Sequence, residues 1–98
     1  MTNITLGVEH VGLAVKNLQE TLSFFVDILG FTKLSDLEGY IAAILTDGIT
    51  KITVWQVENP DSAIPFDRKK NIGLHHLAFK IDSFEKLDEL HKKLLTVA

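Results

Sequence analysis

Apolar and small residues alternate near the start of the chain, which predicts a strand over residues 10–15. One side of this strand is aliphatic: Val11, Leu13 and Val15. The other side has small residues and one imidazole: His10, Gly12 and Ala14. Because successive side chains of a strand point to opposite faces, we expect one face to pack in a core and the other to stay open.

The next segment has the pattern of an amphipathic helix with defined ends. Asn17 is suited to an N-cap, and Glu20 follows three residues later. Apolar residues then recur at helical spacing: Leu18, Leu22, Phe25, Ile28 and Leu29. Gly30 supplies the stop. We expect this helix to cover the aliphatic face of the strand.

Three further strand-like segments follow, at residues 31–37, 40–45 and 51–57. The Asp47-Gly48 pair predicts a tight turn between the second and third of them. The first 58 residues therefore predict the order βαβββ.

The chain then repeats its beginning. Gly73, His76 and an alternating apolar set in residues 73–81 match Gly7, His10 and their neighbours. A cap at Asp82 or Ser83 leads into a second helical pattern with these apolar residues: Phe84, Leu87, Leu90, Leu94 and Leu95. We expect one α+β domain over residues 1–98: a complete βαβββ module (1–58), a linker (59–72) and a partial second βα module (73–98).

Composition narrows the function classes. With 98 residues, the chain has room for one core. A net charge of −3 offers no broad attraction for nucleic acid or an anionic membrane, and no apolar run approaches the ~20 residues that cross a bilayer. The absence of cysteine excludes disulfides and thiolate metal sites. We expect a cytoplasmic protein whose partner is a small molecule, with no nucleic acid and no membrane.

The repeated strand with its histidine, the helix between the strands and the segments 55–57, 60–66 and 73–79 together resemble the vicinal-oxygen-chelate superfamily, which includes glyoxalases, bleomycin-resistance proteins and extradiol dioxygenases. The resemblance implies an open cup formed by the curled sheets of two modules. In metal-dependent members, ligands come from the first and last strands of each module. By position, His10 and His76 would be metal ligands here, and Thr53 occupies the last-strand position.

This donor set leaves two functions open. Imidazoles suit Zn, Ni, Fe or Mn, but a catalytic ion needs about three protein ligands, and Thr53 is a poor replacement for a carboxylate. Gln56 is the nearest better donor, but alternation puts it on the other face unless the strand has a bulge. We favour a protein that binds a small molecule in a cup lined by Trp55, Tyr40 and Thr53. The alternative is a divalent-metal-dependent lyase, isomerase or dioxygenase.

Other polar residues have mainly structural interpretations. Trp55 is as compatible with a core as with a cup. Alternation directs His75 away from His76, and we expect His91 to be half buried in packing on the second helix. Arg68, Lys69 and Lys70 form a basic spot, either a solvated loop or a contact for an anionic group.

The second module has no sheet partners of its own after its helix. A second copy of the chain could cover its apolar face, which predicts a homodimer with the cup near the interface. Alternatively, the chain is a naturally shortened binding protein or a fragment of a longer enzyme.

Overall fold

The computed structural model describes residues 2–97 and divides the chain between Asp61 and Ser62 into two compact units. We describe the N-terminal unit and the C-terminal unit separately. A short 3₁₀ turn, Pro60–Ser62, lies at the boundary.

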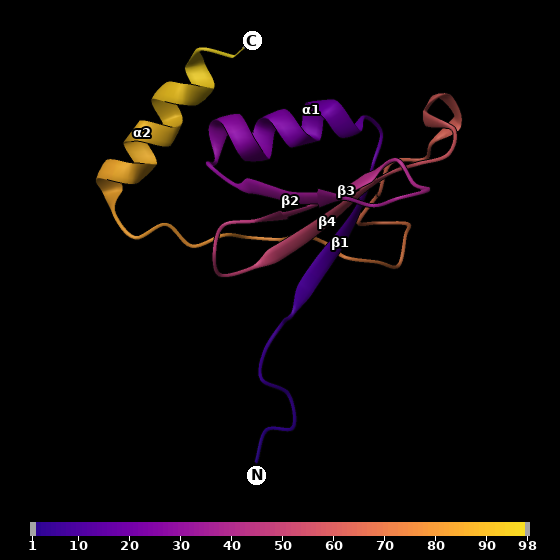
Figure 1. Cartoon of the computed structure of the whole chain (residues 1–98), viewed down its shortest axis with the longest axis horizontal. Helices are drawn as coiled ribbons and strands as arrows, with labels where there is room; N and C mark the ends of the chain where they lie inside the picture. The colour runs from indigo at the N-terminus through magenta and orange to yellow at the C-terminus, as the bar shows by residue number, and fades with distance from the viewer. Residues whose placement is uncertain (1, 98) are drawn as a thin grey trace. The chain divides into compact units, whose positions relative to one another are not determined.

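The N-terminal unit contains one mixed sheet. Its strands are β1 (His10–Val15), β2 (Thr32–Asp36), β3 (Ala42–Thr46) and β4 (Lys51–Gln56), and they lie in the order β1-β4-β3-β2. β1 pairs parallel to β4, whereas the β4–β3 and β3–β2 pairs are antiparallel. Helix α1 (Leu18–Ser23) continues into a π-helical segment, Phe24–Ile28, and covers one face of the sheet (Figure 1). The predicted βαβββ order and the α+β class are confirmed.

Helix α1 begins where the sequence predicts. The side chain of Asn17 accepts a hydrogen bond from the backbone N–H of Glu20 at 3.0 Å, which satisfies one of the unpaired donors of the first turn. Gln56 Oε1 accepts from the backbone N–H of Leu18 at 3.0 Å, so the last strand also caps the helix. At the other end, Gly30 has a φ of 82°, a left-handed conformation that glycine adopts without strain.

The core lies between α1 and the sheet. Its buried side chains come from the helix, the following turn and the two central strands: Leu18, Phe25, Phe31, Leu45, Ile52 and Val54. The aliphatic face of β1 packs against this cluster, as predicted from its alternation. Burial of one such aliphatic or aromatic side chain stabilises a fold by about 1.5–3 kcal/mol, so this layer holds the unit together.

The hairpin between β3 and β4 turns at Asp47 and Gly48, as predicted. Asp47 Oδ1 accepts hydrogen bonds from the backbone N–H groups of Ile49 (2.9 Å) and Thr50 (2.8 Å). Gly48 has a φ of 94°, which suits glycine. The two amides hold the pKa of the Asp47 carboxyl below its usual value, because they stabilise its charged form.

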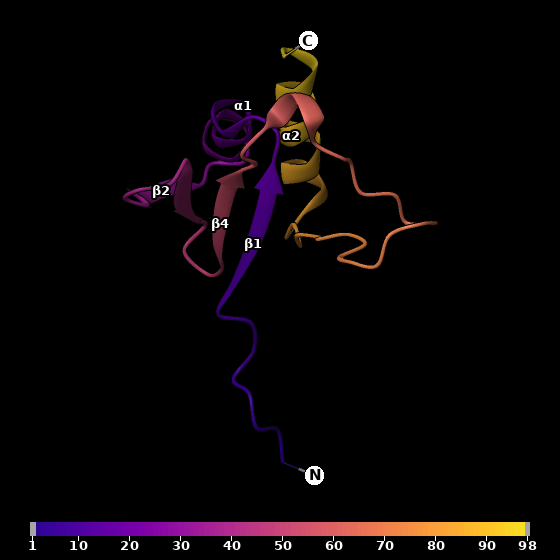
Figure 2. The same ribbon diagram turned by 90° about the vertical axis from the view of Figure 1, so that its right-hand side faces the viewer.

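In the C-terminal unit, helix α2 (Phe84–Leu95) is present as predicted. The hydroxyl of its N-cap, Ser83, accepts a hydrogen bond from the backbone N–H of Lys86 at 3.1 Å. Figure 2 shows the long irregular segment, drawn in orange, that leads into α2.

The prediction of a strand over residues 73–81 is wrong: this segment joins no sheet among the described residues. A strand exists only where its backbone pairs with a neighbour. In the N-terminal unit β1 has β4 as its neighbour, whereas residues 73–81 pair with no strand among the described residues. Within residues 2–97, no helix is long and apolar enough to span a bilayer.

Candidate functional site

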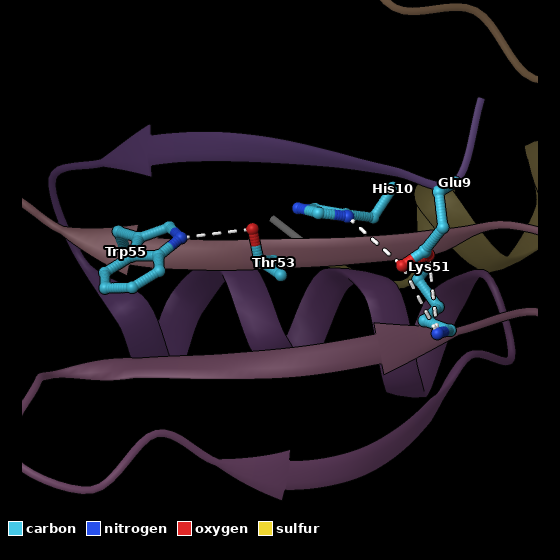
Figure 3. Close-up of polar contacts among 5 residues, drawn as sticks. All are labelled: Glu9, His10, Lys51, Thr53 and Trp55. Atoms are coloured by element: carbon cyan, nitrogen blue, oxygen red, sulfur yellow. Dashed lines mark hydrogen bonds and ion pairs between the residues drawn. The ribbon is translucent and has the colours of Figure 1, made fainter.

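The sheet face opposite α1 is the open face of the N-terminal unit. The strand register sets Gly12 of β1 beside Thr53 of β4, and Ala14 beside Trp55. β3 places Ile44 on the other side of Thr53. Ile52 and Val54 on the helix-facing side of β4 are fully buried, whereas Thr53 is half-buried and Trp55 is exposed. Figure 3 shows His10, Thr53 and Trp55 together on this face, with α1 behind the sheet.

Trp55 is held in place by a hydrogen bond along its own strand. Its indole Nε1–H donates to Thr53 Oγ1 at 3.1 Å. Because residues two apart on a strand share a face, the indole lies along β4 instead of projecting straight out. Trp55 keeps 37% of its surface exposed, so its packing in the core, one of the two interpretations of the sequence, does not occur in this structure.

Gly12 makes room for this pair, a role that the sequence interpretation missed. A Cβ atom built on Gly12 would lie 3.0 Å from Thr53 Oγ1 and 3.8 Å from Trp55 Nε1. A side chain at this position would therefore crowd the hydroxyl that accepts the indole bond. The sequence feature that could have predicted this role is the single glycine within an alternating strand, because such a glycine often marks a close approach between the backbone and a neighbouring group.

Tyr40 completes an aromatic corner. Its ring meets the Trp55 ring edge-on, with centroids 5.3 Å apart and an interplanar angle of 72°. Tyr40 is 67% exposed. The structure thus brings together Tyr40, Thr53 and Trp55, the three residues predicted to line a binding site.

His10 lies farther along the same face and contacts Glu9, which in turn forms an ion pair with Lys51. Its Nδ1 is 3.3 Å from Glu9 Oε1, and Lys51 Nζ is 3.4 Å from the other oxygen of that carboxylate (Figure 3). The hydrogen bond and charge of Lys51 lower the pKa of Glu9 below its usual value, with a smaller contribution from His10. Neither Lys51 nor Glu9 was predicted to take part in this cluster; the parallel register of β1 and β4 places Lys51 beside His10, and Glu9 is the preceding residue in the chain.

The donors for a metal ion are fewer than the resemblance implies. Gln56 lies on the helix side, where its oxygen caps α1, and the β1–β4 and β3–β4 registers are continuous, so no bulge turns it to the open face. The part of the chain between residues 2 and 97 has no group of three or more His, Asp or Glu side chains arranged for a metal. By itself, the donor set of the open face does not fit a catalytic ion.

The histidines of the C-terminal unit differ from the prediction. The Nδ1 atoms of His75 and His76 lie 2.9 Å apart, and the rings meet edge-on with centroids at 5.1 Å. The expectation that they point in opposite directions depended on a strand at this segment, and without the strand the alternation does not hold. His91 is exposed and not half buried, so this prediction is wrong. The pairing of His10 with His76 stays a prediction, since the two belong to different units.

Comparison with known proteins agrees with the fold. Residues 7–96 match the family profile described as Glyoxalase/Bleomycin resistance protein/Dioxygenase superfamily. A proposed glyoxalase from Bacillus halodurans is 30% identical, with a TM-score of 0.71 over 93% of this chain and 69% of that one. A lactoylglutathione lyase from Agrobacterium tumefaciens is similar at 15% identity (TM-score 0.68; 97% and 72% covered). An integron cassette protein from the Halifax Harbour sewage outfall is similar at 21% identity (TM-score 0.63; 94% and 71% covered). No curated protein matches the chain.

Proposed function

This chain belongs to the glyoxalase, bleomycin resistance protein and dioxygenase superfamily, and on that premise we propose that it binds a small molecule on the open face of its N-terminal sheet. The aromatic corner of Tyr40 and Trp55 is the observation that carries the proposal. Exposed aromatic rings held in fixed positions present a large apolar contact area at little entropic cost. A flat or apolar ligand would stack against them.

The polar groups of the face would orient such a ligand. Thr53 Oγ1 accepts the indole hydrogen bond and keeps its own hydrogen for a ligand acceptor. Lys51 and His10 add donors farther along the face. A few polar groups beside an apolar surface are typical of small-molecule sites.

A second copy of the chain would cover exposed apolar side chains of the C-terminal unit. The C-terminal unit exposes apolar side chains on both its irregular segment and α2: Leu77, Phe79, Ile81, Leu87, Leu94 and Leu95. Exposed apolar side chains in such number are typical of an association site. We expect a homodimer, which sedimentation equilibrium would detect as twice the chain mass; a folded monomer would refute this part of the proposal.

Trp55 provides its own binding assay, because it is the one tryptophan of the chain. A panel of planar aromatic compounds, with bleomycin among them, should change its emission in a saturable way. Tyr40→Ala should weaken the affinity by about tenfold, which corresponds to the loss of one stacking partner. Ile49→Ala, which removes an exposed apolar side chain at the hairpin turn, is the matched control and should bind like the wild type. Equal effects of the two variants would contradict the site.

Metal-dependent chemistry of the glyoxalase type is the second candidate, and the presence of His10 on the open face favours it. A divalent ion such as Zn, Ni, Fe or Mn would supply Lewis-acid polarisation of paired substrate oxygens. The open face does not hold such an ion alone, so the remaining ligands would have to come from His76 or from a second copy.

Metal analysis separates the two candidates. The purified protein and its His10→Ala variant would be compared by mass spectrometry of bound metals, alongside turnover with lactoylglutathione in the presence of added divalent ions. Stoichiometric metal that is lost in the variant would replace the binding-only function with the enzymatic one. Wild-type protein that stays free of metal and inactive, while Trp55 reports a bound ligand, would support the first proposal.

A further inference from the structure

A loop of the C-terminal unit, residues 67–71, is closed by its own hydrogen bonds. The backbone N–H of Asp67 donates to Asn71 Oδ1 at 2.6 Å, and the N–H of Asn71 donates back to the Asp67 carbonyl at 2.8 Å. Asp67 Oδ1 also accepts from the N–H of Lys69 at 2.9 Å. This reciprocal pairing fixes the backbone that carries three consecutive cations.

The three cations are Arg68, Lys69 and Lys70. None of them has an ion pair with a carboxylate in the described part of the chain, although the protein as a whole carries a net charge of −3. The nearest acid in sequence, Asp67, is engaged with the loop backbone. The loop is therefore a local positive site on an acidic protein, with side-chain donors available to a ligand.

A hollow of about 570 Å³ opens beside the loop. The polar part of its lining consists of Asp67, Arg68, Lys70 and Asn71, and Lys69 is not part of it. Apolar residues form another part of the lining: Ile64, Pro65 and Phe66. The Phe66 ring lies near Gly73: a Cβ atom added to this glycine would be 3.7 Å from the ring, an ordinary van der Waals distance.

We propose that this hollow binds an amphipathic anion, meaning a phosphate or carboxylate group carried on a small aromatic or aliphatic body. Arg68 and Lys70 would bind the anionic group, since guanidinium and ammonium donors suit phosphate and carboxylate oxygens. Phe66 and Ile64 would contact the apolar body. The volume is within the range of small-molecule pockets, about 300–1,000 Å³. The hollow shares no residue with the open face of the N-terminal sheet, and the proposal does not depend on the function of that face.

The test is a set of separate titrations of the full chain with phenyl phosphate, inorganic phosphate and phenol, each monitored by two-dimensional amide NMR. Shifts should map to residues 64–73. Phenyl phosphate should bind more tightly than inorganic phosphate or phenol. Its affinity should fall as salt is added, because salt screens exposed charges. Benzoate in place of phenyl phosphate tells whether a carboxylate serves as well as a phosphate.

Variants of the same loop sharpen the test. Lys70→Gln should weaken the affinity for phenyl phosphate about threefold, as expected for one solvent-exposed charge contact. The double variant Arg68→Gln/Lys70→Gln should weaken it about tenfold. Lys69→Gln removes the same charge from a neighbour outside the hollow and should leave the affinity nearly unchanged. Phe66→Ala should weaken the affinity for phenyl phosphate and leave the affinity for inorganic phosphate unchanged.

Three results would overturn the proposal. Equal losses in Lys69→Gln and Lys70→Gln would show unspecific attraction to a basic loop. Equal affinities for phenyl phosphate and inorganic phosphate would remove the apolar part of the site. Shifts that map elsewhere in the chain, with 64–73 unmoved, would remove the site altogether. Amide spectra of each variant verify that the fold is retained.

Discussion

Substitution of Gly12 by alanine tests the close packing of the open face. The new Cβ would lie 3.0 Å from Thr53 Oγ1, closer than most such contacts in proteins. Thr53 can relieve the contact by rotating its side chain, but the hydroxyl then leaves the indole of Trp55, which it meets at 3.1 Å. Loss of one hydrogen bond costs about 0.5–1.5 kcal/mol.

An opposing contribution comes from the unfolded chain. Gly12 is not among the glycines with positive φ, so alanine fits its backbone. Replacing glycine at such a position stabilises a protein by about 0.4–1 kcal/mol, because the unfolded chain loses freedom. The two contributions nearly cancel, and we expect Gly12→Ala alone to change the free energy of unfolding by less than about 1 kcal/mol in either direction.

The contact becomes measurable in a double-mutant cycle with Thr53→Ala. Without the hydroxyl, the nearest group to the new Cβ is Trp55 Nε1 at 3.8 Å, an ordinary contact. In that background Gly12→Ala should stabilise by about 0.4–1 kcal/mol. The coupling between the two sites should therefore be about 0.5–1.5 kcal/mol, the value of the indole bond.

Urea unfolding followed by Trp55 emission gives all four free energies, at one fixed protein concentration because association shifts apparent stability. The emission of folded Gly12→Ala should also shift, since the indole loses its fixed partner. Additive free energies, with Gly12→Ala equally stabilising in both backgrounds, would refute the close contact and with it the arrangement of Thr53 and Trp55.

Three further predictions concern the framework of the site. Leu45→Ala should destabilise by about 2–5 kcal/mol in urea unfolding, because Leu45 is fully buried, whereas a loss below about 1 kcal/mol would mean that the core is misassigned. Asn17→Ala should cost about 0.5–2 kcal/mol by removing the cap of α1; Gln19→Ala at an exposed helix position is its control. The lowered pKa of Asp47 contributes stability above the usual carboxyl value of about 3.9, and that contribution is lost as the pH falls through the lowered pKa. As the pH is lowered below about 3.9, the free energy of unfolding of Asp47→Asn should therefore fall less than that of the wild type. Parallel pH profiles of the two free energies would contradict the hydrogen-bonded turn.

Local patterns in the sequence were sufficient for the N-terminal unit. The alternation of Val11, Leu13 and Val15, the cap at Asn17 and the turn at Asp47 each depend on neighbours within a few residues. Such signals are short-range, so they specify the elements and the faces on which Thr53 and Trp55 lie. The same reasoning failed at residues 73–81, where a strand pattern without a strand partner forms no ladder, and where His75 and His76 consequently lie together.

The sequence by itself determined the element order of the N-terminal unit, the family and the residues of the open face, because hydrophobic period and turn chemistry are properties of the local chain. Only the tertiary structure decided how those residues meet. The parallel register of β1 and β4 brings Gly12 against Thr53 and places Lys51 beside the Glu9–His10 pair, and the cap on α1 takes Gln56 out of the site. Register and side-chain contacts between distant segments depend on the packing of the whole sheet, which no local pattern encodes.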